Sequence, residues 1–398
     1  MNRMPKLRFK EFNIKWEEKK LGDITKFSKG KLISKEDITE TGIECIRYGE
    51  LYTTYGEVIT KIVSKTNLNV KDLVLSEKND IIIPSSGETA IDIAKASCVT
   101  KSEVALGGDL NILKLNENGI FLSYYLNNKL KYQIASLAQG ASVVHLYENH
   151  LKKLKVLFPS LNEQQKIADF LSSVDKKISI IEEKLDLFKD YKKGIMQKIF
   201  KQELRFKDSN GNDYPEWEEK RLGDVFSFKQ GYQIPFKEQI KIKEKGYVRY
   251  LYISDFFSDK NLLYVKDDGK EKITETDITV ANTGNTAGSF YRGKSGILSN
   301  NMFNIQNDEK VVTNDFLFQF LGTSLYSNQL KTFFNSSGQP HLGHKNMSMI
   351  IINYPVSFEE QQKIANFLSS IDKKNDNLAT ELENLKEFKK GLLQQMFI

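Results

Sequence analysis

The segment that decides the fold is EQQKIADFLSSVDKK at residues 163–177, which recurs as EQQKIANFLSSIDKK at residues 360–374. Each copy runs on into a similar lysine-rich end, KKGIMQKIF at residues 192–200 and KKGLLQQMF at residues 389–397. The two copies lie 197 residues apart, from 163 to 360, which far exceeds the ~20–50 residue period of solenoids and propellers. The chain is therefore predicted to contain a duplicated domain.

Both copies have the hydrophobic pattern of a long helix. Apolar residues recur in alternate steps of four and three, the spacing of an a/d heptad seam, at Ile167, Leu171, Val174, Ile178, Ile181, Leu185 and Phe188, and again at Ile364, Leu368, Ile371, Leu378, Leu382 and Leu385. A proline and an S-x-x-E capping box precede each seam, with Ser160 and Glu163 in one copy and Ser357 and Glu360 in the other. We expect a helical rod of about 60 Å from each copy.

Two equal rods in one chain can pair along their seams, and antiparallel pairing would relate the halves by a pseudo-twofold axis. Asn375 is the one polar residue in the second seam, where the first has Ile178, and such a residue typically fixes the register of a coiled coil. The alternative is that each helix packs on a separate local core, as amphipathic helices often do.

A second pair of repeated segments marks the start of each half. WEEKKLGDITKFSKG at residues 16–30 recurs as WEEKRLGDVFSFKQG at residues 217–231, and LRFK precedes both. Between the frame segments the halves diverge, with short strand-like runs, glycine and asparagine turns and a few shorter helices. We predict an α+β unit in each half, so that one scaffold carries two different sets of side chains.

Composition excludes several classes of protein without naming a function. The 398 residues are 40% hydrophobic and 28% charged, which argues against a disordered chain, and no apolar run approaches the ~18 residues that cross a membrane. The N-terminal segment has no apolar h-region, so we expect no secretory signal, and two cysteines, Cys45 and Cys98, cannot build a disulfide framework. A cytoplasmic location is the simplest expectation. The net charge of +6 permits nucleic-acid binding without requiring it.

Two types of polar loop occur in both variable blocks. Residues 85–89, SSGET, correspond to NTGNT at 282–286, and QGAS at 139–142, leading to His145, corresponds to SGQP at 337–340, leading to His341. Glycine lets backbone approach a ligand closely, while Gln, Asn, Ser and His offer donors and acceptors to base edges. Ordinary surface turns have the same composition, so the loops alone leave this alternative open.

Catalytic motifs are not evident. Residues 288–295, GSFYRGKS, match the phosphate-binding pattern G-x-x-x-x-G-K-S, but the residues that follow are poor helix formers, and the mechanism needs a helix starting at the Lys-Ser pair. A basic hairpin that contacts phosphate is the favoured interpretation, and a nucleotide hydrolase is the alternative. The four histidines lack the spacing of a zinc site. We expect a binding protein that has no catalytic site, metal or cofactor of its own.

The frame segments resemble the specificity subunits of type I restriction-modification systems. The resemblance rests on P-K-L-R-F at residues 5–9, and on two copies each of W-E-x-x-x-L-G-D, E-Q-Q-K-I-A-x-F-L-S-S-x-D and K-K-G-x-x-Q-x-x-F, in that order. It covers essentially the whole chain and is weakest in the variable blocks. It implies target recognition domains at residues 1–158 and 201–355, separated by conserved helices at 159–200 and 356–398 that form an antiparallel coiled coil.

The resemblance also implies a function and partners. Each target recognition domain would bind one half of a bipartite target in double-stranded DNA, while the helices set the spacer between the halves. Two modification subunits would supply S-adenosylmethionine-dependent adenine methylation, and restriction subunits ATP-driven translocation and cleavage. The alternative is a non-enzymatic coiled-coil scaffold that binds proteins.

Candidate DNA contacts combine basic residues for phosphates with small polar residues for base edges. They are Lys29, Lys31, Arg47, Ser86, Gly87, Lys95, Gln139, Gly140, Ser142, His145, Asn282, Thr283, Asn285, Arg292, Lys294, Gly338, Gln339, His341 and Lys345.

Overall fold

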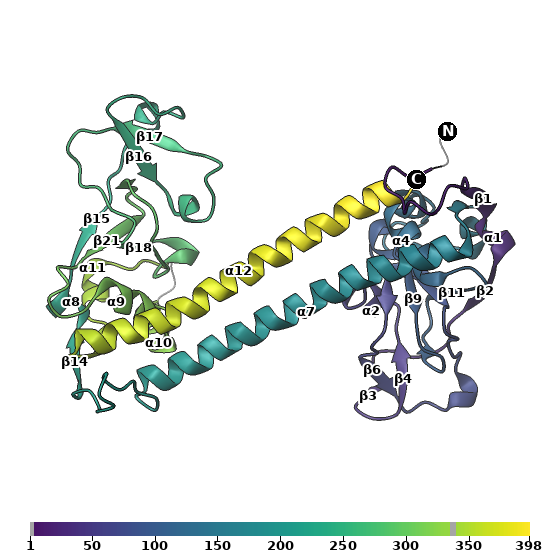
Figure 1. The fold of residues 1–398 in the computed structure, drawn as a ribbon, viewed down its shortest axis with the longest axis horizontal. Coiled ribbons are helices and arrows are strands. Elements are labelled where there is room, and N and C mark those ends of the chain that lie inside the picture. The colour runs from purple at the N-terminus through teal and green to yellow at the C-terminus, as the bar shows by residue number, and fades with distance from the viewer. Residues whose placement is uncertain (1–3, 335–339) are drawn as a thin grey trace. The chain divides into compact units, whose positions relative to one another are not determined.

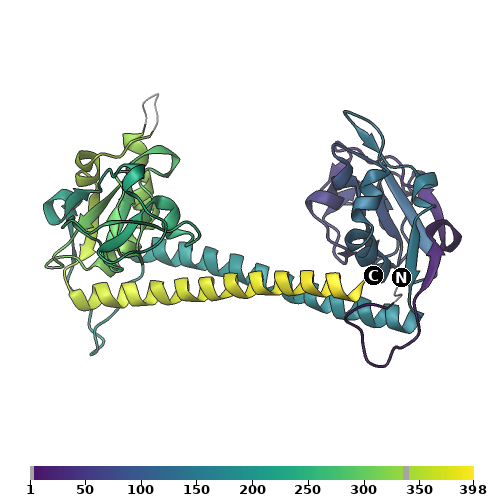
Figure 2. The ribbon, with the colours of Figure 1, turned by 90° about the horizontal axis from the view of Figure 1, so that it is seen from above.

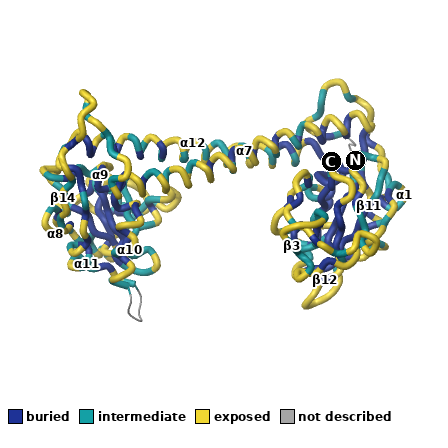
Figure 3. Tube along the Cα trace, turned by 90° about the horizontal axis from the view of Figure 1, so that it is seen from below, coloured by how far each residue is buried: buried dark blue, intermediate teal, exposed yellow. Residues whose placement is uncertain are grey.

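The computed structural model describes residues 4–334 and 340–398 and divides into two compact units. Unit 1 comprises Met1–Glu182 and Thr380–Ile398, and unit 2 comprises Glu183–Ala379. Each unit holds one globule together with segments of both long helices (Figure 1). Figure 3 shows the buried residues gathered in the sheets of each globule and along one stripe of each helix. None of the helices in the described part of the chain is long and apolar enough to cross a membrane.

The two predicted long helices are α7, Leu161–Phe200, and α12, Phe358–Met396. Within each unit they lie alongside each other (Figure 2). In unit 1, Asp175 of α7 pairs with Lys389 of α12 at 2.7 Å, and Glu182 pairs with Lys386 at 2.6 Å. The residue number on α7 rises from 175 to 182 while that of its partner on α12 falls from 389 to 386. The helices are therefore antiparallel, which confirms the prediction.

The seam residues near each globule also join the core of that globule. In unit 1, Ile167 and Leu171 of α7 share one hydrophobic core with Leu392 and Met396 of α12 and with residues of the globule. In unit 2, Ile364 and Leu368 of α12 share the corresponding core with Met196 and Phe200 of α7. Burial of these side chains, at about 25 cal/mol per Å² of apolar surface, attaches each globule to its helix pair.

The glutamates of the predicted capping boxes do not cap their helices. Glu163 is 1% exposed, and both its oxygens accept hydrogen bonds from the guanidinium of Arg8 at 2.7 Å. Glu360 is fully buried and accepts from Arg205 at 3.2 and 3.0 Å. A buried carboxylate requires a charged partner, and the LRFK arginines supply one. Only the serine half of one box is present, since the Ser357 hydroxyl accepts from the backbone N–H of Glu360 at 3.4 Å.

The same clusters explain why the tryptophan and the first glutamine belong to the repeat. The indole N–H groups of Trp16 and Trp217 point at Glu163 and Glu360, at 3.4 and 3.3 Å. The amides of Gln164 and Gln361 donate to the carbonyls of the prolines that precede the helices, at 3.0 and 2.8 Å. They also accept from backbone N–H groups of the globules, at 3.0 and 2.8 Å. The repeated frame segments therefore fix each globule to the start of a long helix.

The unit 1 globule contains two main sheets and two short two-stranded pairings. The five-stranded sheet has the order β2 (Thr25–Lys29), β11 (Leu110–Leu115), β7 (Ile81–Pro84), β9 (Ser97–Val99), β5 (Val58–Ile59). The four-stranded sheet has the order β10 (Ala105–Leu106), β4 (Ile43–Ile46), β6 (Ser64–Thr66), β3 (Ile38–Thr39). The pairs are β1 (Glu17–Lys20) with β13 (Lys155–Phe158) and β8 (Ser86–Gly87) with β12 (Val144–His145). Its helices are α1 (Leu21–Ile24), α2 (Glu50–Thr53), α3 (Ala90–Ile93), α4 (Gly119–Asn128), α5 (Lys131–Ser136) and α6 (Glu148–Leu151), with the 3-10 turn η1 (Val70–Asp72).

The unit 2 globule repeats much of this plan. Its sheets are β15 (Ser227–Gln230), β21 (Met302–Gln306), β18 (Ile278–Ala281), β19 (Phe290–Tyr291), then β17 (Leu263–Lys266), β16 (Tyr247–Leu251), β20 (Ile297–Leu298), and the pair β14 (Trp217–Arg221) with β22 (Ile351–Pro355). Its helices are α8 (Leu222–Val225), α9 (Asn314–Leu321), α10 (Ser324–Phe333) and α11 (His344–Ser348), with 3-10 turns η2 (Phe236–Glu238), η3 (Ile253–Phe256) and η4 (Gly284–Thr286). These elements confirm the predicted α+β class.

Gly30 and Gly231, which end the repeated WEE segments, sit where the chain passes very close to another backbone. A Cβ on Gly30 would lie 1.9 Å from the carbonyl oxygen of Gly107, and one on Gly231 would lie 2.1 Å from that of Ser299. Residues 107–109 and 299–301 are therefore equivalent in the two globules, and only glycine is accommodated opposite them.

Candidate nucleic-acid interface

The two predicted polar loops of unit 1 are neighbours in space. Ser86 and Gly87 form β8 and pair with His145 and Val144 of β12. The N–H of Leu146 donates to the carbonyl of Ser85 at 2.9 Å, and Gln139 and His145 exchange two backbone hydrogen bonds of 2.9 and 2.7 Å. Segments almost 60 residues apart thus form one surface in unit 1.

The corresponding loops of unit 2 meet in the same way. Thr283 forms a β-bridge with His341, and the N–H of Leu342 donates to the carbonyl of Asn282 at 2.8 Å. The N–H of Gly284 donates to the carbonyl of Pro340 at 2.9 Å. The candidates Gly338 and Gln339 lie outside the described residues.

A third segment completes each junction and was not selected from the sequence. The N–H of Ser85 donates to the carbonyl of Asp109 at 2.7 Å, and in unit 2 the N–H of Asn282 donates to that of Asn301 at 3.0 Å. Asp109 and Asn301 are both exposed, whereas Asn282 is buried and its amide oxygen has no hydrogen-bond partner in the described part of the chain. We call these two places the three-segment junctions. In unit 1 the sequence marks this segment only by the turn at Gly107-Gly108. No local sequence pattern predicts that it meets the loop at residue 85, or that Asn301 meets residue 282.

The residues predicted to contact DNA fall into a buried and an exposed group. Ser86, Gly87 and Asn282 are buried and hold the loops together through backbone or amide hydrogen bonds. Thr283 is partly exposed. The candidates with exposed side chains or backbone are Lys29, Lys31, Gln139, Gly140, Ser142, His145, Asn285, His341 and Lys345.

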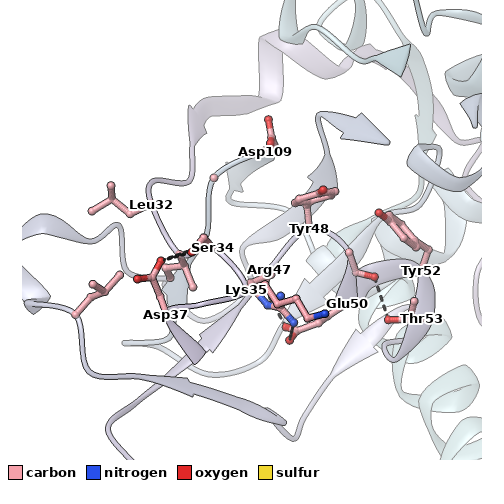
Figure 4. Close-up of a pocket in the computed structure, with 14 residues that line it drawn as sticks. Leu32, Ser34, Lys35, Asp37, Arg47, Tyr48, Glu50, Tyr52, Thr53 and Asp109 are labelled. Atoms are coloured by element: carbon pink, nitrogen blue, oxygen red, sulfur yellow. Dashed lines mark hydrogen bonds and ion pairs between the residues drawn. The ribbon is translucent and has the colours of Figure 1, made fainter. Parts of the chain in front are cut away.

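A cavity of about 860 Å³ lies beside the unit 1 junction and shares Asp109 with it (Figure 4). It is formed by residues 32–35, residues 47–50, residues 52–53 and residues 108–109, together with Asp37 and Leu68. Tyr48 and Tyr52 lie near each other on one side, with ring centroids 6.4 Å apart. The cavity combines aromatic surface with charged groups, which suits contact with bases and phosphates.

Arg47 contributes a partly exposed guanidinium to this cavity. One of its terminal nitrogens lies 3.2 Å from a carboxylate oxygen of Glu50, and 27% of the side chain is exposed. Glu50 is itself held by the hydroxyl of Ser64 at 2.5 Å and by the backbone N–H of Arg47 at 3.0 Å. The guanidinium is therefore oriented by a fixed carboxylate while part of it still faces solvent.

The wall of the cavity has an uncommon backbone. Leu32, Ile33 and Asp109 have φ angles of 55°, 61° and 60°, in the left-handed region that β-branched residues such as isoleucine rarely adopt. Hydrogen bonds from Gly108 N–H to Leu32 carbonyl, at 2.7 Å, and from Lys31 N–H to Leu106 carbonyl, at 3.0 Å, hold this conformation. Such strain typically accumulates at functional sites, where the surrounding structure maintains it.

Three of the predicted phosphate contacts, Lys95, Arg292 and Lys294, already contact other groups of the protein. The ammonium of Lys95 donates to the carbonyl of Tyr55 at 2.5 Å, and burial lowers its pKa. Arg292 pairs with Asp315 at 2.7 Å and stacks over the ring of Phe318. These contacts give Lys95 and Arg292 structural roles, which weakens their assignment to phosphate.

Lys294 is the lysine of the phosphate-loop pattern, and no helix starts at Lys294 or Ser295. The predicted basic hairpin is not formed, because β19 and β20, on either side of this loop, belong to different sheets. Its ammonium contacts both carboxylate oxygens of Asp259, at 2.9 and 3.0 Å. The nucleotide-hydrolase alternative therefore lacks both the helix and the free lysine that its mechanism requires. Among residues 4–334 and 340–398, no group of three or more His, Cys, Asp or Glu residues is arranged to hold a metal ion.

Comparison with known proteins finds a match to each half of the chain. The model of the type I restriction modification DNA specificity domain matches the chain twice, over residues 13–188 and 214–387. The chain is 33% identical over 210 residues to the specificity subunit of the type I restriction enzyme MjaVIII from Methanocaldococcus jannaschii, covering 51% of this chain and 47% of that protein. It is 27% identical over 418 residues to the putative MjaX specificity subunit of the same organism, covering 95% and 92%.

A solved structure shares the fold. The S subunit of a type I restriction-modification system from M. genitalium superimposes with a TM-score of 0.69 at 20% sequence identity, and the comparison covers 99% of both chains.

Proposed function

The chain belongs to the type I restriction modification DNA specificity family, and on this premise we propose that it is the DNA-recognition subunit of a type I restriction-modification complex. Each globule binds one half of a bipartite target in double-stranded DNA. The paired helices α7 and α12 set the spacer and dock two modification subunits, and restriction subunits join the complex. The subunit has no catalytic site or cofactor of its own and acts in the cytoplasm.

The observation that carries this proposal is the three-segment junction found in both globules. Equivalent backbone hydrogen bonds build it in each unit, from Ser85 to Asp109 and from Asn282 to Asn301. The exposed side chains nevertheless differ, because Asp109 occupies one junction and Asn301 the other. The two globules thus present different hydrogen-bonding groups at equivalent positions of the same scaffold. This arrangement suits a target with two unlike half-sites.

Strand pairing shows a further difference between the globules. Ile46 of β4 pairs with Leu106, and Leu251 of β16 pairs with Leu298, so the residues that follow, Arg47 and Tyr252, are equivalent. Arginine can donate two hydrogen bonds to one guanine, which tyrosine cannot do. The cavity beside Arg47 is thus a base-contact site peculiar to the first half-site in this proposal.

The contacts divide by chemistry. Lys29, Lys31 and Lys345 are exposed and carry the phosphate contacts, which supply affinity without sequence information. Base contacts come from Arg47, Gln139 and His145 in unit 1, and from Asn285 and His341 in unit 2, with Asp109 and Asn301 as additions from the structure.

The test is to map methylated adenines in cells that carry the modification subunits with wild-type or altered chain. Arg47→Ala is expected to relax or change only the first half-site, and His341→Ala only the second; a good bidentate base contact is worth about 1–3 kcal/mol of discrimination. Asp315→Asn, at a surface ion pair away from both junctions, is the control. Unchanged methylation patterns in both variants would refute the assignment of these residues. A protein that shows no salt-dependent DNA binding even with its modification subunits would instead fit the scaffold alternative.

A further inference from the structure

Unit 2 contains a second cavity, away from its three-segment junction. It measures about 670 Å³ and is lined by residues from the last turns of α7, from the connection between α9 and α10, and from α12. Gly322 and Thr323 separate α9, which ends at Leu321, from α10, which begins at Ser324. Thr323 then caps α10, since its hydroxyl accepts from the N–H of Tyr326 at 3.2 Å. The break opens one wall of the cavity.

The floor of the cavity is apolar. Met196, Phe200 and Leu321 are buried there, at 7%, 4% and 2% exposure, and the ring of Phe290 adds to the wall. Leu325 stands at the edge with 38% of its surface exposed. Ligand sites in proteins typically have this size and this predominantly apolar lining, with a few polar groups that fix orientation.

The rim is basic. Lys192 is neutralised by Asp372 at 2.5 Å, whereas Lys189 and Lys201 have carboxylate neighbours only at 3.9 Å, and Lys193 has no ion-pair partner among the described residues. The positive charge at the rim is therefore only partly compensated.

Asn375 adds a hydrogen-bond acceptor to the lining. Its amide oxygen is buried and has no hydrogen-bond partner among the described residues. A buried acceptor left unpaired costs free energy, which a ligand donor would recover.

The equivalent place in unit 1 is closed by side chains. Lys389 and Asp175 repeat the pair formed by Lys192 and Asp372, but Lys389 also pairs with Glu57 at 3.1 Å. The hydroxyl of Tyr124 donates to Asp175 at 2.5 Å, and the amide of Asn128 donates to the carbonyl of Leu393 on α12. The cavity in unit 2 is therefore a property of its own sequence and does not follow from the helix pairing as such.

We propose that this cavity is a binding site for an amphipathic organic anion: a flat apolar body on the Met196 and Phe200 floor, an acidic group at Lys189 and Lys193, and a hydroxyl or amino donor at Asn375. The positive rim and apolar floor together select for such a ligand over a neutral or cationic one. The site is lined by α7, by α12 and by the connection from α9 to α10. A bound ligand would therefore contact the globule of unit 2 and both long helices at once. The inference does not depend on the proposed DNA recognition.

The experiment measures binding of 8-anilinonaphthalene-1-sulfonate, an aromatic sulfonate that fluoresces in apolar sites, to the full-length chain. One saturable site is expected. Gly322→Trp should abolish it, because the new side chain starts 3.4 Å from the Met196 methyl group and extends into the cavity. Lys189→Gln with Lys193→Gln should weaken it about tenfold, the usual effect of losing a charge-assisted contact. Lys386→Gln with Lys390→Gln, at the positions 197 residues later, is the matched control and should bind as the wild type does.

Circular dichroism establishes whether each variant is folded. If Gly322→Trp does not fold, the variant with Lys189→Gln and Lys193→Gln still tests the proposal. Absence of a saturable site, or equal affinity in the lysine variant and its control, would overturn the proposal. Binding of a glutamate-rich tryptophan peptide in place of the sulfonate would also overturn it and would point to a protein partner.

Discussion

Replacing Arg8 with alanine is expected to destabilise unit 1 by about 3 kcal/mol, the lower end of the range for breaking a buried ion pair. The guanidinium makes two hydrogen bonds of 2.7 Å to Glu163, and the two side chains are 8% and 1% exposed. In the variant, the donor that the carboxylate of Glu163 keeps among residues 4–334 and 340–398 is the indole N–H of Trp16, at 3.4 Å. The large cost arises because a charge stays buried without its partner, and the retained donor places the value at the lower end of the range.

The thiols provide the assay, because both cysteines belong to unit 1. Cys45 and Cys98 are 0% and 1% exposed, and burial raises the pKa of their thiols to about 11 and about 12. Only the thiolate reacts, so native protein at pH 8 should resist a thiol reagent until unit 1 unfolds. With a urea dependence of about 2 kcal/mol per molar, a loss of 3 kcal/mol lowers the midpoint of labelling by about 1.5 M.

Two companion variants make the result interpretable. Arg8→Ala with Glu163→Gln removes the orphaned charge and should recover about 2 kcal/mol of the loss, since a buried neutral amide costs far less than a buried charge. Arg205→Ala makes the matched change in unit 2, where the structure holds Glu360 in the same way, and should lower the thiol midpoint less than Arg8→Ala does. A midpoint for Arg8→Ala within about 0.3 M of the wild type, a shift of under 1 kcal/mol, would refute the reasoning. So would a double variant as unstable as the single one.

Three further outcomes are expected. Gly30→Ala should cost more than about 3 kcal/mol, because its Cβ would meet the Gly107 carbonyl oxygen at 1.9 Å, whereas Gly56→Ala, with nothing within 4 Å, should change stability little; urea unfolding measures both. For Lys389, burial lowers the pKa but its two carboxylate partners outweigh it, so the pKa is raised. Stability from this lysine is therefore complete below its usual pKa of about 10.4 and is lost as pH rises beyond it, so the unfolding free energies of wild type and Lys389→Met should converge only at high pH. Insertion or deletion of helical residues within 175–190 should change the spacer between the methylated half-sites, and an unchanged spacer in a folded variant would exclude the helices as the determinant.

The candidate site was only partly predictable from the sequence. The polar loops at residues 85–89 and 139–145 were identified by their composition, yet their pairing with each other and with Asp109 depends on segments far apart in the chain. The cavity beside Arg47 was missed for the same reason, since three separate segments form it. The sequence suggests Lys95 as a phosphate contact, but in the structure this lysine is half-buried and its ammonium donates to the Tyr55 carbonyl, a contact that no local pattern encodes.

The sequence alone determined the duplicated frame and the two long helices, because heptad spacing and helix propensity act between residues three and four apart. It also identified the class of the globules through short strands and turns. Only the tertiary structure decided which groups the charged residues meet. Glu163 and Glu360 have the spacing of helix caps, but folding buries them, and a buried carboxylate is stable only beside a charged partner, so the arginines of LRFK bind them instead.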